Sequence, residues 1–231
     1  MPVLGLGTWE LTRDTPGSVE RALDLGYRMI DTSGDYGTQP GVGEGIRRSG
    51  LDRDELYVVT KVEEDEDAYR STVENLDELG MEHADLMLVH RPPAEGAGEG
   101  LWAGLIRAQE EGLATDIGVS NYSTAQIDEL IRLTGETPVV NQIEWSPFGW
   151  SQEMLDFCRD HRIVIQAYSP LTRGNRLKDP RLSALAAEYQ RTPAQLLIRR
   201  DTQMGNAPLP KANQPAHMEE NLGFSGFEIA D

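Results

Sequence analysis

Short apolar segments alternate with amphipathic ones along this chain, and that alternation constrains the fold more than any other feature. Eight apolar segments have the character of buried strands. They begin near Leu4, Tyr27, Tyr57, Ala84, Ala114, Val139, Ile163 and Asn206. Their starts are roughly 23 to 30 residues apart until a longer last interval, and the segments between them read mostly as amphipathic helices.

Helix signals support this division. Ala68 to Leu79 is the clearest helix, because Val73, Leu76 and Leu79 recur at helical spacing and Gly80 follows as a stop. Further helices are predicted for Ser18–Leu25, which ends at Gly26, for Gln152–Asp160, and for two segments that open at Asp179-Pro180 and Thr192-Pro193.

The lack of a glycine-rich turn after the first strand decides between two parallel folds. A doubly wound sheet would normally place such a turn there, but Gly5 and Gly7 lie within the predicted strand, and no Walker or dinucleotide-binding motif occurs. Eight predicted strands alternating with helices in 231 residues therefore favour a (β/α)8 TIM barrel of the α/β class. No low-complexity stretch marks a boundary, so residues 1–231 are expected to form a single domain. In such a barrel the active site lies at the C-terminal ends of the strands.

The charge balance excludes one class of partner. The chain has 39 acidic and 21 basic residues, a net charge of -18, and its only lysines are Lys61, Lys178 and Lys211. A surface this negative argues against nucleic acid as a partner. It suits a salt-rich cytoplasm, where ions screen the repulsion; an ordinary acidic soluble protein is the alternative.

No segment predicts membrane insertion or secretion. No apolar run approaches the ~18 residues of a membrane span, and Met1–Leu4 lacks the basic and apolar regions of a signal peptide. Cys158 is the only cysteine, so no internal disulfide can form, and in its predicted helix it is expected to be a core residue rather than a nucleophile. We therefore expect a cytoplasmic monomer without a membrane partner or a metal site.

Four polar residues are predicted to lie at the C-terminal ends of three neighbouring strands. They are Asp31 and Tyr36 after the second strand, Lys61 after the third (Leu56–Thr60) and His90 after the fourth (Asp85–Val89). Each alone has an ordinary structural explanation, as a cap, a packing residue, a solvated terminus or a satisfied histidine. On the barrel prediction they share one mouth, where an ammonium would lower the pKa of a nearby phenol while a carboxylate holds the ammonium in place.

Several motifs, spread over nearly all 231 residues, occur in the order typical of one enzyme family. They are Gly5–Trp9 (GLGTW), Gly26–Thr32 (GYRMIDT), Asp85–His90 (DLMLVH), Gly118–Tyr122 (GVSNY), Asn141–Glu144 (NQIE), Ala167–Leu171 (AYSPL) and Leu209–Lys211 (LPK). In these motifs the chain resembles the aldo-keto reductases. The resemblance places that family's catalytic tetrad of Asp, Tyr, Lys and His on Asp31, Tyr36, Lys61 and His90.

The resemblance implies hydride transfer from a reduced nicotinamide to the carbonyl carbon of an aldehyde or ketone, with Tyr36 donating the proton to the oxygen. Tyr36 would have to act as an acid near neutral pH, although an unperturbed phenol has a pKa of about 10. The positive charge of Lys61 would favour the phenolate form of Tyr36, and Asp31 would fix Lys61. His90 would orient the substrate carbonyl. NADPH is the expected cofactor, with NADH as the alternative.

Further site residues carry over by position. Cofactor contacts are predicted for Thr8, Trp9, Asp31, Ser120, Asn121, Gln142, Tyr168, Ser169, Pro170, Leu171, Lys211, Asn213, His217, Glu220 and Asn221, and substrate contacts for Trp9, Tyr36, His90 and Arg91. By their counterparts in the family, Ser120, Asn121 and Gln142 would hold the carboxamide, Tyr168 would stack on the nicotinamide, and Lys211 would begin the adenosine end. Ser169–Leu171, with Arg173 and Arg176, would hold the pyrophosphate; a solvated basic loop is the alternative.

The chain departs from the family pattern at several positions. His217 stands where many members have Arg, and Ala212 where Ser is common, which leaves NADH open. Arg91 follows the catalytic His where Trp is common and would make that side of the pocket more polar. The usual N-terminal hairpin and C-terminal loop are missing, so we expect exposed apolar surface and loose substrate binding.

Two alternatives to a reductase stay open. The fold can bind a nicotinamide without useful turnover, as a regulatory or sensor protein; the intact tetrad speaks against this and the missing loop for it. A destabilised gene fragment is the other. The sequence does not define the substrate, because barrel strands fix the chemistry while loops choose the substrate.

Overall fold

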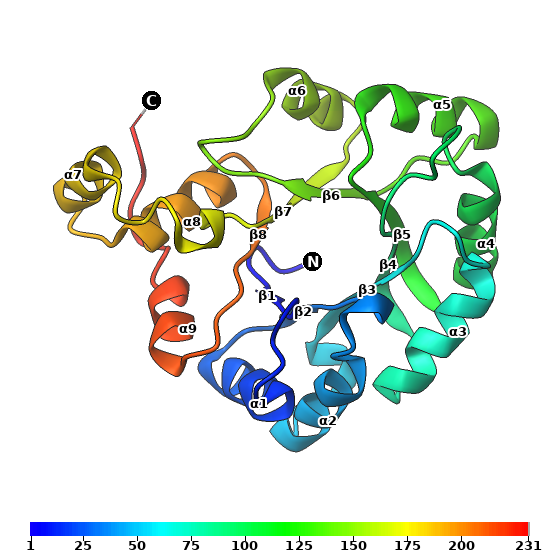
Figure 1. Ribbon diagram of the computed structural model, residues 1–231, viewed down its shortest axis with the longest axis horizontal. Coiled ribbons are helices and arrows are strands. Elements are labelled where there is room, and N and C mark those ends of the chain that lie inside the picture. The colour runs from blue at the N-terminus through cyan, green and yellow to red at the C-terminus, as the bar shows by residue number, and fades with distance from the viewer. Residues whose placement is uncertain (231) are drawn as a thin grey trace.

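Within residues 1–230, which the computed structural model describes, eight parallel strands pair in chain order to form a nearly closed barrel (Figure 1). They are β1 (Leu6–Gly7), β2 (Met29–Asp31), β3 (Tyr57–Val62), β4 (Ala84–Val89), β5 (Ala114–Ser120), β6 (Val140–Glu144), β7 (Val164–Tyr168) and β8 (Ala207–Leu209). Every strand begins within two residues of its predicted start. The predicted (β/α)8 fold is confirmed; Asp231, the last residue of the predicted domain, lies outside the described residues.

Two backbone hydrogen bonds draw the first strand towards the last. The Gly5 N–H donates to the Pro208 carbonyl at 3.1 Å, and the Gly7 N–H donates to the Pro210 carbonyl at 3.2 Å. A Cβ atom on Gly7 would lie 3.0 Å from the Leu209 carbonyl oxygen, closer than nearly all real side chains come. Glycine therefore allows the close approach that brings the two ends of the sheet together.

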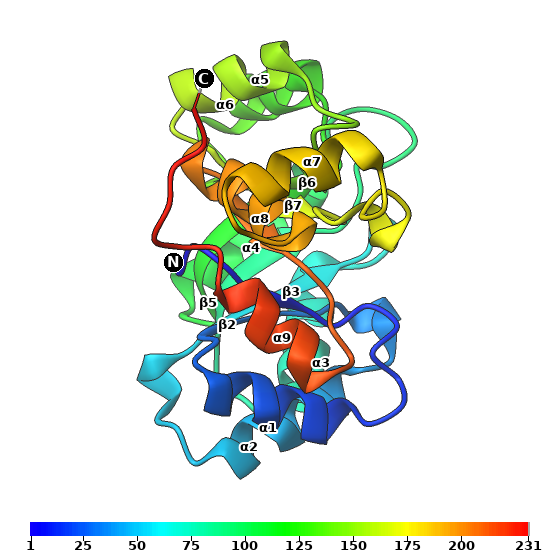
Figure 2. The same ribbon diagram turned by 90° about the vertical axis from the view of Figure 1, so that its left-hand side faces the viewer.

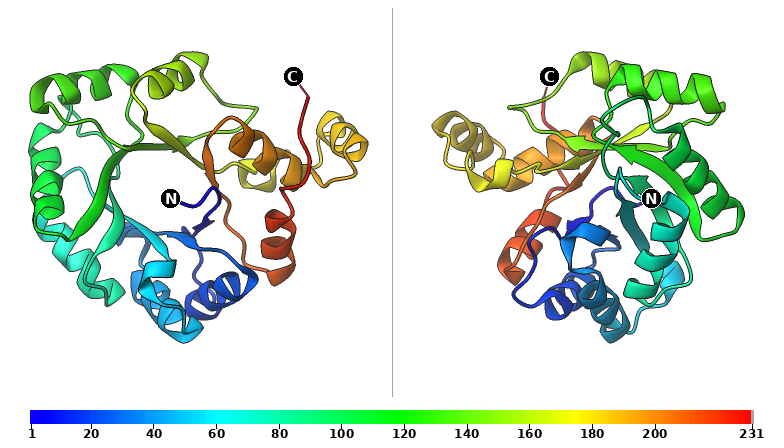
Figure 3. Two further views of the ribbon diagram at one scale, coloured as in Figure 1. Left: turned by 180° about the vertical axis from the view of Figure 1, so that it is seen from behind. Right: turned by 45° about the vertical axis from the view of Figure 1, so that its right-hand side comes forward.

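Helices surround the strands on the outside (Figure 1). They are α1 (Thr15–Leu25), α2 (Gln39–Ser49), α3 (Ala68–Leu79), α4 (Glu99–Glu110), α5 (Thr124–Thr134), α6 (Gln152–Asp160), α7 (Pro180–Glu188), α8 (Pro193–Gln203) and α9 (Pro215–Leu222), with 3-10 turns η1 (Gly34–Tyr36), η2 (Arg53–Glu55) and η3 (Thr172–Gly174). Figure 2 shows α7, α8 and α9 together on one side of the barrel, and in Figure 3 α7 lies farthest from the ring. Among residues 1–230, no helix combines the length and apolar character needed to cross a membrane.

The helix bounds follow local capping signals. α3 and α6 begin and end where predicted, and α7 and α8 open at the predicted caps. α1 begins at Thr15 and not at the predicted Ser18. The reason is that Asp14 accepts a hydrogen bond from the Gly17 N–H at 3.1 Å and so caps an earlier first turn, which also holds Pro16.

Alternation along the strands divides the core into an inner and an outer layer. Leu86 and Leu88 of β4 pack with residues of β2, β3, β6 and β8, inside the barrel. Met87 and Val89 point the other way and join the layer that contains Trp102 of α4. Cys158 is buried in this outer layer, as predicted, and burial raises the pKa of its thiol to about 11.

Asp201 on α8 makes stability depend on pH. Its side chain is buried, and although Arg200 Nη1 donates to Oδ1 at 3.1 Å, Oδ2 has no hydrogen-bond partner among residues 1–230. Burial raises the pKa of Asp201 to about 7, and Arg200 only partly opposes this. The unfolded chain releases the same proton at about 3.9. The folded state therefore binds more protons between these values, and this group lowers stability as pH rises through that range.

We expect Asp201→Asn to raise the free energy of unfolding at pH 8 by about 2–4 kcal/mol, because an amide does not ionise and one pKa unit is worth about 1.4 kcal/mol. At pH 4 the gain should largely vanish, since the wild-type carboxyl is then protonated when folded. Urea unfolding of both proteins at the two pH values measures the difference. An equal change at both would contradict the assignment.

Candidate active site

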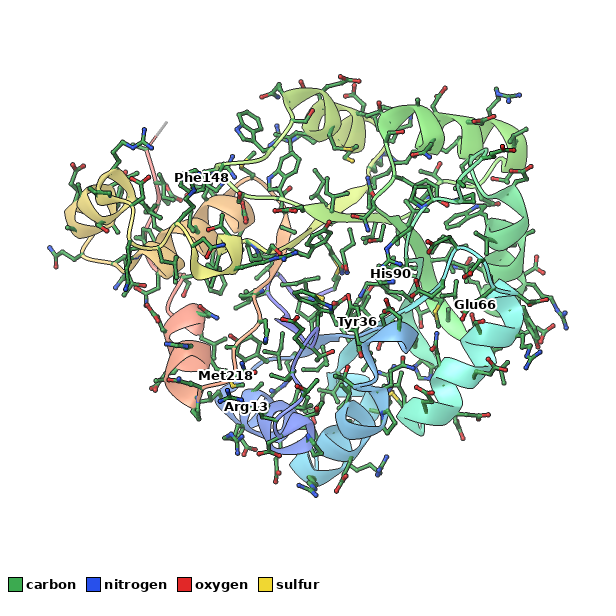
Figure 4. All side chains as sticks on the ribbon, viewed as in Figure 1. Arg13, Tyr36, Glu66, His90, Phe148 and Met218 are labelled. Carbon is green, nitrogen blue, oxygen red and sulfur yellow. The ribbon has the colours of Figure 1, made fainter. Side chains whose placement is uncertain are left out.

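A cavity of about 720 Å³ lies at the C-terminal ends of the strands, and nearly all predicted site residues line it. They are Trp9, Asp31, Tyr36, His90, Arg91, Ser120, Asn121, Gln142, Tyr168, Ser169, Pro170, Leu171, Lys211, Asn213, His217, Glu220 and Asn221. In Figure 4 the labelled Tyr36 and His90 lie close together towards the inside of the ring, whereas Glu66 lies at its rim.

Two predicted residues are buried behind the cavity wall. Thr8 does not line the cavity, and its hydroxyl oxygen lies 3.3 Å from that of Thr38, so it contacts protein rather than facing a ligand. The predicted cofactor contact of Thr8 stays a prediction. Lys61 is also buried, and it contacts two residues that line the cavity, Asp31 and Tyr36.

The two arginines of the predicted pyrophosphate loop point to different places. Arg173 lines the main cavity, with its guanidinium 5.1 Å from the centroid of the Trp9 ring. Arg176 lines only a second, smaller cavity, which Arg173 also borders, and lies there 5.3 Å from the centroid of the Phe148 ring. The structure thus brings Arg173, and not Arg176, to the predicted site.

Lys61 is the centre of the polar cluster. It lies within β3, which continues through Val62 beyond the predicted end at Thr60. Its Nζ donates to Asp31 Oδ1 at 2.9 Å, to the Thr32 carbonyl at 2.7 Å and to Tyr36 Oη at 3.3 Å. Burial alone would lower the pKa of Lys61, but Asp31 and Tyr36 together outweigh it and hold that pKa above its usual value. The ammonium therefore stays charged although it is buried.

Tyr36 lies at the end of η1, one residue before Gly37, whose φ of 63° lets the chain turn back. Burial raises the pKa of Tyr36, and this effect exceeds the lowering by the Lys61 ammonium. The sequence prediction considered only the ammonium. The net direction differs because the phenol is enclosed by protein as well as charged neighbours.

His90 follows β4 and meets Tyr36 edge to face, with ring centroids 5.7 Å apart. The Asn121 side-chain amide donates to the His90 carbonyl at 3.0 Å and fixes the backbone there. Glu63, which sequence reasoning missed, places Oε1 2.6 Å from His90 Nδ1. A signal was present, because Glu63 directly follows β3 and is two residues after Lys61, the spacing at which side chains of an extended chain point the same way.

The side chains of Asn121 and Gln142 line the cavity, and we call them the amides of the cavity floor. They connect to this cluster through hydrogen bonds. Gln142 Nε2 donates to Asp31 Oδ1 at 2.7 Å and to Gln166 Oε1 at 2.9 Å. Tyr168 Oη donates to Asn121 Oδ1 at 2.9 Å, and Asn121 has a positive φ of 63°, which asparagine tolerates well. Gln166, also missed from the sequence, thus helps to orient the residue that braces Asp31.

A parallel barrel with a charged lysine, a carboxylate, a phenol and an imidazole gathered at one mouth defines a barrel enzyme equipped for proton transfer. The model of the aldo/keto reductase family matches residues 3–231, and the chain belongs to that family. It is therefore an oxidoreductase. The sequence predictions of the family and of an NAD(P)H-dependent enzyme are confirmed.

Relatives and solved structures agree with this placement. An aldo-keto reductase of Mycobacterium tuberculosis is 41% identical over 236 residues, covering 100% of this chain and 84% of the relative. The crystal structure of an aldo/keto reductase from Brucella melitensis is 36% identical with a TM-score of 0.93, covering 100% of this chain and 91% of that one. A Bombyx mori aldo-keto reductase in complex with NADP is 31% identical with a TM-score of 0.93, covering 100% and 86%.

Proposed function

We propose that this protein reduces the carbonyl group of aldehydes or ketones, with NADPH as the reductant and Tyr36 as the proton donor. The observation that carries the proposal is the position of Tyr36 Oη, on the cavity wall and 3.3 Å from the Nζ of Lys61. A phenol held beside a fixed ammonium can release its proton at one defined place. His90 lies against the same phenol and is proposed to orient the substrate oxygen.

Tyr36 is proposed to donate the proton, and Lys61 to stabilise the phenolate that remains. Because burial raises the pKa of Tyr36, the phenol keeps its proton at neutral pH until a substrate arrives. When that proton passes to the carbonyl oxygen, a phenolate forms beside the Lys61 ammonium, which stabilises it in a partly buried site. Asp31, at 2.9 Å, holds the ammonium in place.

The cavity fits a nicotinamide dinucleotide. Asn221 is buried at its wall, and its Nδ2 has no hydrogen-bond partner among residues 1–230, which leaves a donor for a ligand. Lys211 and Arg173 supply positive charge for phosphate groups, and the half-buried Tyr168 offers a ring for stacking. Ser120 completes the proposed carboxamide contacts with the amides of the cavity floor. When bound, NADPH supplies the hydride for the carbonyl carbon.

Lys211 is proposed to favour NADPH over NADH, because its exposed ammonium lines the cavity where a 2′-phosphate would need positive charge. We expect Lys211→Ala to weaken NADPH binding about five- to tenfold and NADH binding by less than about twofold. Fluorescence titration of both cofactors measures this. Lys178→Ala, a change outside the cavity, is the matched control, and equal losses for the two cofactors would contradict the assignment.

The proposed function is tested by following reduced-nicotinamide absorbance with a panel of aldehydes and ketones, and by detecting the alcohol product. Turnover with NADPH is the expected result. A folded protein that binds NADPH but reduces no carbonyl compound would contradict the proposal and favour a sensor protein.

We further propose that residues 1–231 act as one domain and as a cytoplasmic monomer. All eight described strands belong to one sheet, which supports a single domain. The net charge of -18 supports a salt-rich cytoplasm, because repulsion between copies is then screened only at high ionic strength. Light scattering at low and high KCl tests the monomer. A single cooperative thermal transition at both KCl concentrations tests the single domain.

A further inference from the structure

The Nδ1 atom of His90 faces only oxygen atoms. Glu63 Oε1 lies 2.6 Å away, Ser33 Oγ 3.4 Å and Asp35 Oδ1 3.5 Å. The contact with Glu63 is sheltered, since the His90 and Glu63 side chains are 8% and 15% exposed. An ionised carboxylate can only accept hydrogen bonds, so the hydrogen in this short contact belongs to Nδ1.

Arg91 binds the other oxygen of the Glu63 carboxylate. Its Nη1 donates to the second carboxylate oxygen, Glu63 Oε2, at 3.0 Å. Both oxygens of Glu63 therefore have a donor, one from His90 and one from a permanently charged guanidinium. Within residues 1–230, the other titratable or charged groups around His90 and Arg91 include Asp35, Tyr36, Glu64 and Tyr168.

We propose that Glu63, braced by Arg91, fixes His90 in the tautomer that carries its hydrogen on Nδ1, so that Nε2 carries a hydrogen only when the ring is doubly protonated. No hydrogen bond of Nε2 to another part of residues 1–230 competes with this, and His90 lines the cavity. Glu63 acts through His90 and is a positioning residue.

One consequence rests on the proposed reductase function. A carbonyl oxygen accepts hydrogen bonds and donates none, so the neutral Nδ1–H ring presents only a lone pair to it. His90 can then hold the substrate oxygen only as an imidazolium. Reduction then becomes acid-activated, with a rate that falls about tenfold per pH unit wherever the neutral ring predominates.

Glu63→Gln should move the hydrogen of the neutral His90 ring from Nδ1 to Nε2. Arg91 has only donors, so it selects the amide oxygen of the new side chain. The amide nitrogen is then turned towards His90 and donates to Nδ1, which must accept. The neutral ring places its hydrogen on Nε2 and can bind a carbonyl oxygen without a second proton.

The tautomer is measured by nitrogen NMR of cofactor-free protein with 15N-labelled histidine, at pH 8.5 with a chelator. The chain has 4 histidines, and loss of one signal set in His90→Asn assigns His90. We expect protonated Nδ1 and bare Nε2 in the wild type, and the reverse in Glu63→Gln. A wild-type ring protonated at Nε2 alone overturns the proposal, and this outcome does not depend on whether the variant folds.

Kinetics give a second readout. The ratio of kcat/KM in Glu63→Gln to that in the wild type should rise with pH, by about tenfold per pH unit where the neutral ring predominates in both proteins. Glu64→Gln is the matched control, because Glu64 lies 3.6 Å from Arg91 and does not touch His90, and its profile should follow the wild type. Parallel profiles in Glu63→Gln overturn the acid activation. The expected tautomers without any carbonyl reduction support the role of Glu63 and count against the reductase function.

Discussion

Tyr36→Phe should lower kcat/KM for carbonyl reduction by about 10²- to 10⁴-fold, the usual worth of a positioned general acid, while cofactor binding stays nearly unchanged. The phenyl ring keeps the edge contact with His90, whose ring centroid lies 5.7 Å away, so the change removes the proton donor and little packing. The assay follows reduced-nicotinamide absorbance with NADPH and then NADH, at high and low KCl.

A second tyrosine of the barrel is the control for this experiment. Tyr57 begins β3, at the end of the barrel away from the cavity, and its hydroxyl donates to Asp116 at 3.3 Å. Tyr57→Phe should leave kcat/KM within about twofold of the wild type, because it removes one hydroxyl outside the site. Turnover retained in Tyr36→Phe would remove Tyr36 from the proton-donor role.

The fold could be predicted largely because its signals are local. Apolar runs, caps and glycine stops placed the strands within two residues and gave the bounds of α3 and α6. Local signals do not predict how β1 approaches β8, since that depends on the Gly5 and Gly7 N–H groups donating to proline carbonyls far along the chain. Such pairing leaves no periodic pattern.

The sequence indicated which residues lie at the mouth of the barrel better than how deeply each of them is buried. The strand ends indicated which residues share the mouth, but the direction of the Tyr36 pKa depends on how much protein encloses the ring, which no spacing reveals. Thr8 and Arg176 show the same limit, because a position near a strand end does not say whether a side chain faces the cavity. Glu63 could have been found from its two-residue spacing to Lys61, since it directly follows the last residue of β3.

The buried pair of Lys61 and Asp31 predicts a large loss of stability on Lys61→Met. Both side chains are nearly inaccessible, 0% and 6% exposed, and Nζ lies 2.9 Å from Oδ1. Methionine fills a similar volume but leaves the carboxylate of Asp31 buried without its cation, which typically costs about 3–5 kcal/mol. The Gln142 amide, at 2.7 Å from the same oxygen, compensates only in part because it is neutral.

The double variant Asp31→Asn with Lys61→Met tests this cause. It carries no buried charge at the pair, and the asparagine oxygen can still accept from Gln142, so we expect it to be more stable than Lys61→Met alone by about 2 kcal/mol or more. The double-mutant cycle is measured by urea unfolding of the cofactor-free wild type, the two single variants and the double variant at one KCl concentration. A double variant that unfolds more easily than Lys61→Met would mean that lost packing, and not the unpaired carboxylate, dominates. Both variants should reduce carbonyls far more slowly than the wild type, because the charge that stabilises the Tyr36 phenolate is absent in each.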